Sequence, residues 1–293
     1  MQLRRHPNAN MLALVARIQP QAGEMNKAQS HRRTVRRRLT TSFDLRAFLP
    51  IGSHARNTAV RWYSDVDVLA LLRRNEAKWG GDIIRSSTFL RKVRDDLEDR
   101  YVWTNVRGDQ QAVVIEFGGG QHRLDVVPAI FDRFDRGRPI YLIPNGSDGW
   151  LETSPQAHSR YLATALQKSG GKLSKVIQLF KWWKFSRSTP IPIQSFYLDM
   201  LMAYSGVCTG VKSYSQCLFS AFKVLADREC RGLRDPLGIA GVLQAAATDR
   251  QREEVNKAVE FALLHAANAL VAERKKDFPE ANRQWNIVFN GQY

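Results

Sequence analysis

Gly52-Ser53 and Ser64-Asp65-Val66-Asp67-Val68-Leu69 are the two stretches that decide the fold of this 293-residue chain. Residues 45–51, before the Gly-Ser pair, have the composition of a β-strand, and residues 54–61, after it, can begin a helix. The start of a helix offers free backbone N–H groups and the positive end of a dipole, so it can hold a phosphate group. Gly52 and Ser53 are therefore candidate phosphate-binding residues.

Two acidic residues follow in an apolar run. Asp65 and Asp67 stand two positions apart among valines and leucines, and the period of two in a strand points both carboxylates to one face. Two like charges side by side repel each other unless a cation binds between them. Mg²⁺ prefers a few carboxylates together with substrate phosphates. The spacing thus predicts a divalent metal site.

A third acid belongs to a predicted hairpin. Residues 111–117 and 122–131 have the pattern of two strands, and Gly118-Gly119-Gly120 supplies the positive-φ conformations of a tight turn. Asp125 lies in the second strand among apolar residues, where an ionised carboxylate is costly unless it is paired or bound to metal. Three acids beside a phosphate-binding Gly-Ser are typical of two-metal phosphoryl transfer.

Together these motifs resemble a known superfamily. Gly52-Ser53, Asp65-Val66-Asp67 and the distant Leu-Asp-Val-Val-Pro-Ala at 124–129 are similar to the nucleotidyltransferases that include DNA polymerase beta. Residues 52–61 with Tyr63-Ser64-Asp65 are most similar to the bacterial cGAS/DncV-like nucleotidyltransferases. Those enzymes make cyclic di- or trinucleotide signals in antiphage defence.

One position departs from the family pattern. Asn57 stands where the family usually has glycine. Asparagine tolerates the left-handed backbone conformation better than other non-glycine residues. We therefore expect the loop to keep its shape.

The resemblance implies a reaction and roles for the acids. A 3′ or 2′ hydroxyl of one nucleotide attacks the α-phosphorus of an NTP, pyrophosphate leaves, and repetition of the step closes a ring. Asp65 and Asp67 hold two Mg²⁺ (or Mn²⁺) ions, and Asp125 binds the ion that activates the hydroxyl. A separate effector protein senses the cyclic product.

Charge is the most unusual feature of the composition, with a net charge of +16 and a pI near 10.1. Residues 1–61 hold twelve Lys and Arg against Glu24 and Asp44, and many of the arginines lie in a predicted helix over residues 24–42. The arginines either form a solvated face that raises the NTP concentration near the site or contact nucleic acid. We do not expect nucleic acid to be required for activity.

Helices dominate the second half. Residues 173–180 carry an apolar stripe, and Lys181 and Lys184 lie beside it, where a lysine commonly extends its ammonium group to solvent. The resemblance implies that Lys181 contacts the donor triphosphate, although Lys184 could take this role. It also assigns Ser195 to phosphate and Phe196 to base stacking, whereas a helix cap and a core residue are the structural alternatives.

Other features of the sequence limit the class of protein. No segment reaches the roughly 18 apolar residues of a membrane span, and residues 11–16 lack the features of a secretory signal. Cys208, Cys217 and Cys230 are odd in number and widely spaced, which is typical of reduced thiols and predicts no zinc site. We expect a cytoplasmic monomer without membrane contact.

These observations predict an α+β nucleotidyltransferase fold with a mixed central sheet. Residues 1–150 form the catalytic lobe with an N-terminal helix, and residues 151–293 form a helical lobe that closes the nucleotide cleft. The predicted function is synthesis of a cyclic di- or oligonucleotide from NTPs. The alternatives are transfer to an RNA end or a protein acceptor, a nucleic-acid-activated oligonucleotide synthase, and a non-catalytic nucleic-acid-binding module.

Overall fold

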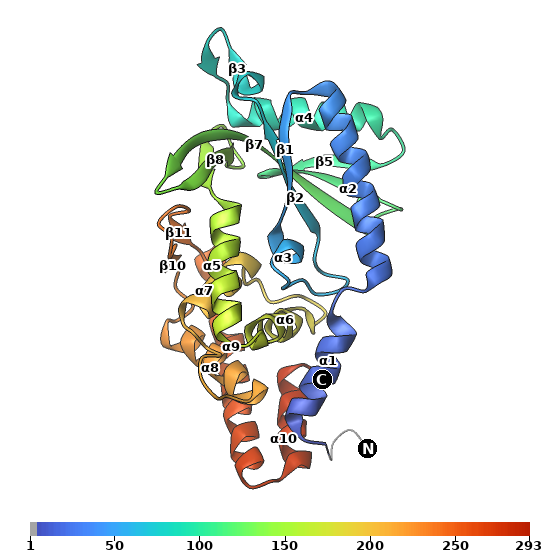
Figure 1. Cartoon of the computed structure of the whole chain (residues 1–293). Coiled ribbons are helices and arrows are strands. Elements are labelled where there is room, and N and C mark those ends of the chain that lie inside the picture. Colours follow the sequence, from blue (N-terminus) through green and yellow to red (C-terminus); the bar gives the residue numbers. More distant parts are fainter. Residues whose placement is uncertain (1–4) are drawn as a thin grey trace. The chain divides into compact units, whose positions relative to one another are not determined.

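Residues 5–293 are described by the computed structural model, and a seven-stranded mixed sheet carries the predicted motifs (Figure 1). The strand order is β1-β2-β7-β6-β5, with β8 paired to β7 and β9 paired to β8. Strands β2 and β7 are parallel, and the other pairs are antiparallel. The bounds are β1 (Leu45–Ile51), β2 (Val66–Leu72), β5 (Asn105–Asp109), β6 (Ala112–Phe117), β7 (His122–Asp135), β8 (Arg138–Pro144) and β9 (Trp150–Thr153).

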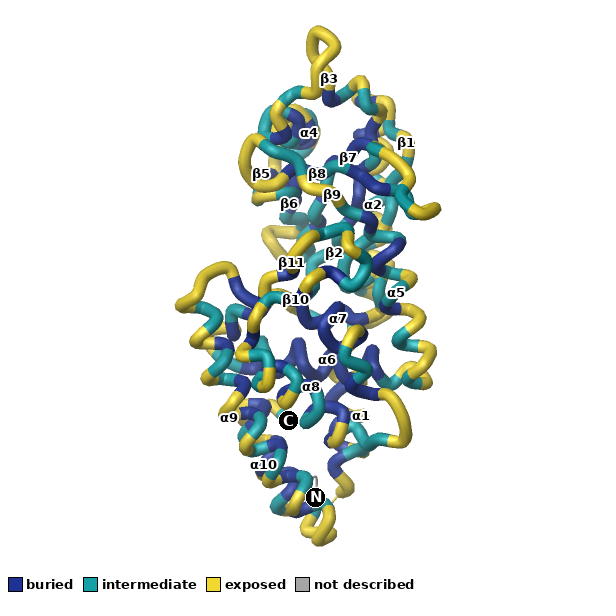
Figure 2. Tube along the Cα trace, turned by 90° about the vertical axis from the view of Figure 1, so that its left-hand side faces the viewer, coloured by how far each residue is buried: buried dark blue, intermediate teal, exposed yellow. Residues whose placement is uncertain are grey.

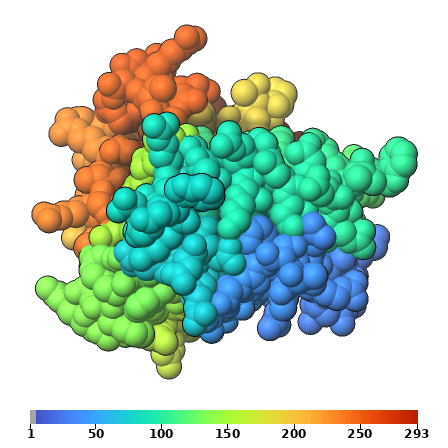
Figure 3. Space-filling view, turned by 90° about the horizontal axis from the view of Figure 1, so that it is seen from above, coloured from blue at the N-terminus to red at the C-terminus, as the bar shows by residue number. Residues whose placement is uncertain are grey.

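Two helices cover one face of this sheet. Helix α2 (Ala22–Ser42) contributes Val35 and Leu39, and α4 (Ser86–Arg100) contributes a similar apolar stripe, to a core that includes Val68 and Val126. Burial of each such side chain stabilises the fold by about 1.5–3 kcal/mol. The remaining faces of α2 carry exposed residues and form part of the molecular surface (blue in Figure 3).

The side chains along each strand alternate between the two faces of the sheet. Val68 packs on the helix side, whereas Leu69 belongs to a smaller cluster with Ala129 on the opposite side. Because side chains alternate along a strand, Asp67 and Asp125 point to the face opposite α2 and α4. The fold thus keeps these carboxylates away from the main core of the sheet.

Contacts within the chain divide it into two compact units. The sheet unit is Pro20–Asn57 with Ser64–Ser159, and the helical unit is the chain up to Gln19, Thr58–Tyr63 and Arg160–Tyr293. Each unit has its own core of buried residues, drawn in dark blue along β7 and along α6 and α7 in Figure 2.

The helical unit contains the remaining long helices. Their bounds are α1 (Pro7–Ile18), α5 (Pro155–Lys168), which begins in the sheet unit, α6 (Lys172–Phe185), α7 (Ser195–Tyr204), α8 (Tyr214–Asp227), α9 (Asp249–Arg274) and α10 (Phe278–Val288). Short strands β10 (Leu233–Arg234) and β11 (Val242–Leu243) form a two-stranded sheet there. In the sheet unit, β3 (Lys78–Trp79) pairs with β4 (Asp82–Ile83) after the 3₁₀ turn η2 (Arg74–Ala77).

The three cysteines are free and buried. Within residues 5–293, no helix combines the length and the apolar character that a membrane span requires.

Helix α1 belongs to the helical unit although it begins the described chain. Its buried stripe of Met11, Leu14 and Ile18 joins the helical core, and its first turn is tied to the end of the chain, since the hydroxyl of Tyr293 donates to the carbonyl of Pro7 at 3.0 Å. The predicted first lobe, residues 1–150, therefore combines parts of both units, and its predicted boundary falls at the start of β9. Contacts between residues that are far apart in the sequence determine which unit each segment belongs to.

The local predictions around the motifs hold except in one segment. Strand β1 and the glycine turn between β6 and β7 lie where the sequence places them, with Gly118 at φ +62°. The predicted helix over 54–61 is wrong, because α3 (Gly52–Ala55) is a single turn. Asn57 has φ +57°, so the expectation of a left-handed residue at this position is confirmed, and that conformation ends the helix.

Candidate active site

Three carboxylates lie at the face of β2 and β7 that is opposite α2 and α4. Asp67 and Asp125 are register partners across these parallel strands, so their side chains lie side by side on the same face. Asp65 immediately precedes β2, and its charge acts on both other carboxylates. Because Asp67 and Asp125 are almost sixty positions apart, only the strand register brings them together.

The electrostatics of this carboxylate cluster favour a cation. Burial, followed by the charges of neighbouring acids, raises the pKa of Asp67 to about 7 and that of Asp65 to about 6. Burial also raises the pKa of Asp125. The ionised forms are destabilised because they lose water and repel each other, so positive charge at this position would be stabilising.

Arg123 supplies such charge in the structure. Its guanidinium donates to both oxygens of Asp125, with Nε–Oδ1 at 2.8 Å and Nη2–Oδ2 at 2.9 Å. It also lies 3.5 Å from Asp65 and 3.6 Å from Asp109, at the end of β5. Arg123 was not predicted as a site residue, although its position two residues before Asp125 on the same strand face indicates that it lies beside that carboxylate.

The donor set of the cluster fits a hard divalent cation. Carboxylate oxygens are the ligands that Mg²⁺ and Mn²⁺ prefer, and the cluster offers those of Asp65, Asp67 and Asp125. As the side chains stand, no group of three Asp, Glu, His or Cys residues in the described chain is spaced to hold one ion, and Arg123 occupies the cluster. Ion binding would therefore require the Arg123 side chain to withdraw.

Gly52 brings the backbone of the Gly-Ser turn against this cluster. A Cβ atom at position 52 would lie 1.8 Å from Oδ2 of Asp67, and Gly52 has φ +70°. Ser53 follows it in α3, and His54 Nε2 lies 3.2 Å from the carbonyl of Ser64, the residue before Asp65. The predicted phosphate-binding motif and the acids thus lie next to each other in the sheet unit.

The two candidate lysines lie in different environments on α6. Lys181 is almost fully buried and pairs with Asp199 at 2.7 Å. Its ammonium also donates to the hydroxyl of Thr58 at 3.1 Å and lies 3.3 Å from the carbonyl of the same residue. For Lys184, burial and then the neighbouring charge of Lys181 lower the pKa to about 8. Lys181 is therefore a structural cation in this conformation, and Lys184 has the more accessible ammonium.

Replacement of Lys181 tests its structural role. We expect Lys181→Ala to lower the free energy of unfolding by about 3–5 kcal/mol, because Asp199 would keep a buried charge without its cation. Chemical denaturation followed by tryptophan fluorescence measures this loss. Lys184→Ala is the matched control on the same helix and should retain most of the stability. A stable Lys181→Ala protein with weakened NTP use would instead support the triphosphate contact.

The remaining predicted contacts lie at the start of α7. Ser195 is the first residue of this helix, but the N-cap is Gln194 and its side chain makes no capping bond. Phe196 is partly buried and packs against the helical core, while the following Tyr197 is fully buried. The exposed ring of Tyr63 was not predicted as a base-stacking candidate. Tyr63 stacks on Phe185 with ring centroids 4.3 Å apart and an interplanar angle of 5°.

Known proteins are similar to this chain in sequence and in fold. The family model of the Second Messenger Oligonucleotide or Dinucleotide Synthetase domain matches residues 6–165. A curated relative named cyclic AMP-AMP-AMP synthase, from Escherichia coli, is 26% identical over 64% of this chain and 59% of its own length. The chain spans about three fifths of the length of the curated relatives it matches.

Solved structures of CdnC from Escherichia coli MS115-1 have the same fold. CdnC in complex with HORMA-deltaN gives a TM-score of 0.74 at 18% identity, covering 97% of each chain. CdnC with ATP gives a TM-score of 0.73 at 19% identity, covering 96% of this chain and 98% of that one. The matched family segment covers more than half of the chain and contains Gly52 and the three acids. The chain belongs to the Second Messenger Oligonucleotide or Dinucleotide Synthetase domain family.

Proposed function

We propose that this protein is a metal-dependent nucleotidyltransferase that joins NTPs into a cyclic di- or oligonucleotide second messenger in antiphage defence. The observation that carries the proposal is the convergence of Asp65, Asp67 and Asp125 beside Gly52 in the family segment. The name of the curated relative supports ATP as the first substrate to test.

In the proposed reaction, a ribose hydroxyl forms a bond to the α-phosphorus of an NTP, and the bond from that phosphorus to the leaving pyrophosphate breaks. Two Mg²⁺ or Mn²⁺ ions would supply activation of the hydroxyl and charge neutralisation of the pyrophosphate. Asp65 and Asp67 would hold both ions, and Asp125 would hold the one at the attacking hydroxyl. Gly52 keeps the turn against Asp67, so that the backbone can approach the phosphates closely.

Residues of the helical unit would bind the nucleotide. Lys184 is the better candidate for the triphosphate, since Lys181 is engaged by Asp199. Ser195 would bind phosphate, and Phe196 would stack on a base, a contact worth about 1–3 kcal/mol. The exposed ring of Tyr63 offers a second stacking surface.

Incubation with labelled NTPs tests the function directly. The purified protein is supplied with each NTP alone and with all four, with Mg²⁺ or Mn²⁺, and we expect pyrophosphate and a product without a phosphatase-sensitive end. Parallel reactions contain RNA, DNA or an acceptor protein. Label that appears only on an RNA end or on protein would establish the alternative transferase function. Ring synthesis only with nucleic acid would establish an activated synthase, and no transfer under any condition would contradict the proposal.

The reactions with RNA or DNA are included because several arginines are exposed on α2. Arg38 pairs with Asp96 at 2.6 Å, whereas Arg33, Arg36 and Arg37 are exposed on the same helix. Contacts from such residues to phosphates would weaken steeply with salt. Activation should therefore be measured near physiological ionic strength, and we expect synthesis without nucleic acid.

Removal of the Arg123 charge should strengthen metal binding. In Arg123→Gln, the carboxylates of Asp65 and Asp125 lose their cation, so we expect Mn²⁺ to bind about tenfold more tightly. Titration calorimetry or the electron paramagnetic resonance of free Mn²⁺ measures this affinity without turnover. The metal-free variant should also unfold at a lower temperature, because the repulsion among the acids is no longer compensated.

The same strand offers a matched control. Arg133 on β7 forms two bonds to Glu152, at 2.8 and 2.9 Å, on exposed surface. Arg133→Gln should leave Mn²⁺ affinity unchanged. Equal affinities in the wild-type, Arg123→Gln and Arg133→Gln proteins would show that Arg123 does not compete with the cation.

A further inference from the structure

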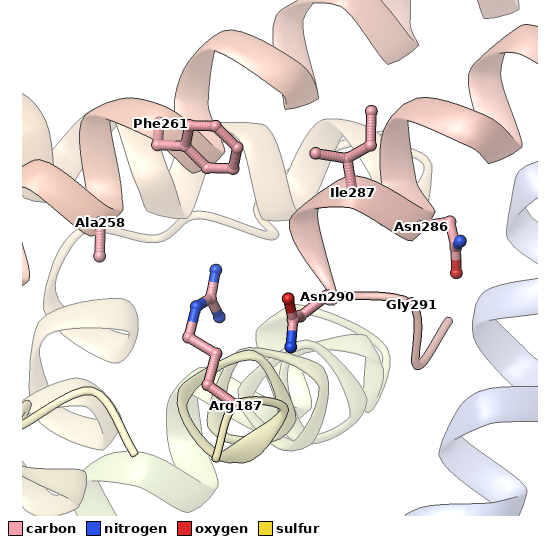
Figure 4. A pocket seen from close by; sticks show the side chains of 7 residues that line it. All are labelled: Arg187, Ala258, Phe261, Asn286, Ile287, Asn290 and Gly291. Atoms are coloured by element: carbon pink, nitrogen blue, oxygen red, sulfur yellow. The ribbon is translucent and has the colours of Figure 1, made fainter. Parts of the chain in front are cut away.

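A cavity of about 490 Å³ lies in the helical unit, and none of the residues assigned to the reaction above lines it. Its walls come from α9, α10 and the residues that follow α6 and α10 (Figure 4). Small-molecule sites in proteins have volumes of roughly 300–1,000 Å³. The cavity is therefore large enough for a ligand of about nucleotide size.

Arg187 provides the one formal charge among the residues that line this cavity. Its Nη1 donates to the carbonyl of Trp183 at 2.9 Å and to the hydroxyl of Ser186 at 3.3 Å, so the guanidinium is fixed at the end of α6. Figure 4 shows the group directed into the cavity. Nε and Nη2 donate to no atom of residues 5–293, and no carboxylate there forms an ion pair with Arg187.

These contacts leave the most specific edge of the guanidinium available. Nε–H and Nη2–H form the fork that binds both oxygens of a carboxylate or phosphate. Burial lowers the pKa of Arg187, and no acid in the described chain counteracts this effect. A cap on α6 accounts for the bonds of Nη1, and the guanidinium carbon lies 5.6 Å from the ring centroid of Trp183, but neither contact uses the N–H groups of the fork. An anion would supply a partner for them.

The opposite wall of the cavity is apolar and held in place. Phe261 is 47% exposed, and its ring packs edge-on against His265, with centroids 4.5 Å apart. His265 Nδ1 lies 2.7 Å from the side-chain oxygen of Gln284 on α10, which fixes the imidazole. Ala258 and Ile287 complete this wall. A flat ring of a ligand can stack on Phe261 with little further ordering of the protein.

Asn290 adds a polar contact between the charged and apolar walls. Its Nδ2 donates to the carbonyl of Ser186 at 2.9 Å, so the orientation of the amide is set by the protein. The amide oxygen is then available to a donor on the ligand. Figure 4 shows this side chain beside the guanidinium of Arg187.

We propose that this cavity binds a small organic anion in which a phosphate or carboxylate, held by Arg187, is joined to a flat ring that stacks on Phe261. A mononucleotide has this chemistry. The site is independent of the proposed catalytic residues, so it would persist in a protein that makes no cyclic product.

Titration with AMP, adenosine, inorganic phosphate and benzoate tests the proposal in the full chain with EDTA present. The readout is the methyl resonance of Ile287 in isoleucine-labelled protein, assigned by Ile287→Val. We expect AMP or benzoate to move it with saturation. Adenosine and phosphate, which each lack one part, should bind about tenfold more weakly or worse. Comparison of AMP with benzoate identifies which anion the fork prefers.

Variants distinguish anion binding at this site from the nonspecific binding of anions to a basic protein. Arg187→Gln should weaken AMP or benzoate binding at least about tenfold, and Phe261→Ala should weaken it independently of the charge. Arg283→Gln removes an exposed arginine of α10 that pairs with Glu280, and it should change nothing. If Arg187→Gln does not fold, Phe261→Ala alone decides. An unmoved Ile287 resonance at millimolar concentrations of all four probes, or wild-type affinity in both the Arg187→Gln and the Phe261→Ala proteins, overturns the proposal.

Discussion

Asp67→Asn is expected to lower the rate of pyrophosphate release by about a thousandfold or more, equivalent to about 4 kcal/mol of activation barrier. The amide keeps the shape of the side chain but withdraws one charged ligand from the ions that Asp65 and Asp67 would share. Stability should not fall. Burial and the neighbouring acids raise the pKa of Asp67 to about 7, so a neutral group at this position relieves repulsion. Initial rates and thermal unfolding without metal measure the two effects.

A second aspartate provides the control for this substitution. Asp132 lies on β7 and pairs with Arg133 and Arg74, outside the carboxylate cluster. Asp132→Asn should keep near wild-type rates. Substantial turnover by a folded Asp67→Asn protein would exclude the proposed metal site.

We expect Gly52→Ala, which adds a single methyl group, to lower activity and stability more than the same addition elsewhere in the sheet unit. The added Cβ would lie 1.8 Å from Oδ2 of Asp67, so either the turn or the carboxylate must move. A displacement of about 1 Å at a reacting centre commonly costs about a hundredfold in rate. The left-handed backbone at φ +70° adds about 1–2 kcal/mol of strain. Pyrophosphate release and chemical denaturation measure the two losses.

Gly119 in the β6–β7 turn isolates the backbone contribution. It has φ +67°, and a Cβ there would meet no atom within 4 Å. Gly119→Ala should therefore lose stability through backbone strain while it keeps its activity. Equal activities of the Gly52→Ala and Gly119→Ala proteins would show that the close approach to Asp67 is unimportant.

The sheet around the acids could be predicted because its signals are local. Alternation along residues 65–72 and the glycine run after Phe117 specify β2 and the β6–β7 hairpin without reference to the rest of the chain. The pairing of Asp67 with Asp125 depends on the register of two parallel strands. Composition does not encode that register, and it was not predicted from the sequence.

The errors and omissions concern contacts between distant residues. The partner of Lys181 is Asp199, on a different helix, and no sequence pattern around either residue predicts this ion pair. The helix predicted over 54–61 fails because Thr58–Tyr63 packs in the helical unit, where Arg61 N donates to the carbonyl of Ile18 at 2.7 Å. Periodicity describes which residues are apolar, but it does not identify the surface that covers them.

Helix α1 has a consequence for the order of events during synthesis. It precedes α10 along the chain and so leaves the ribosome earlier, yet Asn10 pairs with Asn282 of α10 at 2.9 Å and Arg17 donates to the carbonyl of Gln292 at 2.7 Å. Its apolar stripe must therefore remain without its final partners until α10 has been translated, during which time it is open to chaperones and to aggregation. The sheet unit has no such dependence on α10, since its last residue is Ser159, so we expect it to fold before the helical unit on the nascent chain.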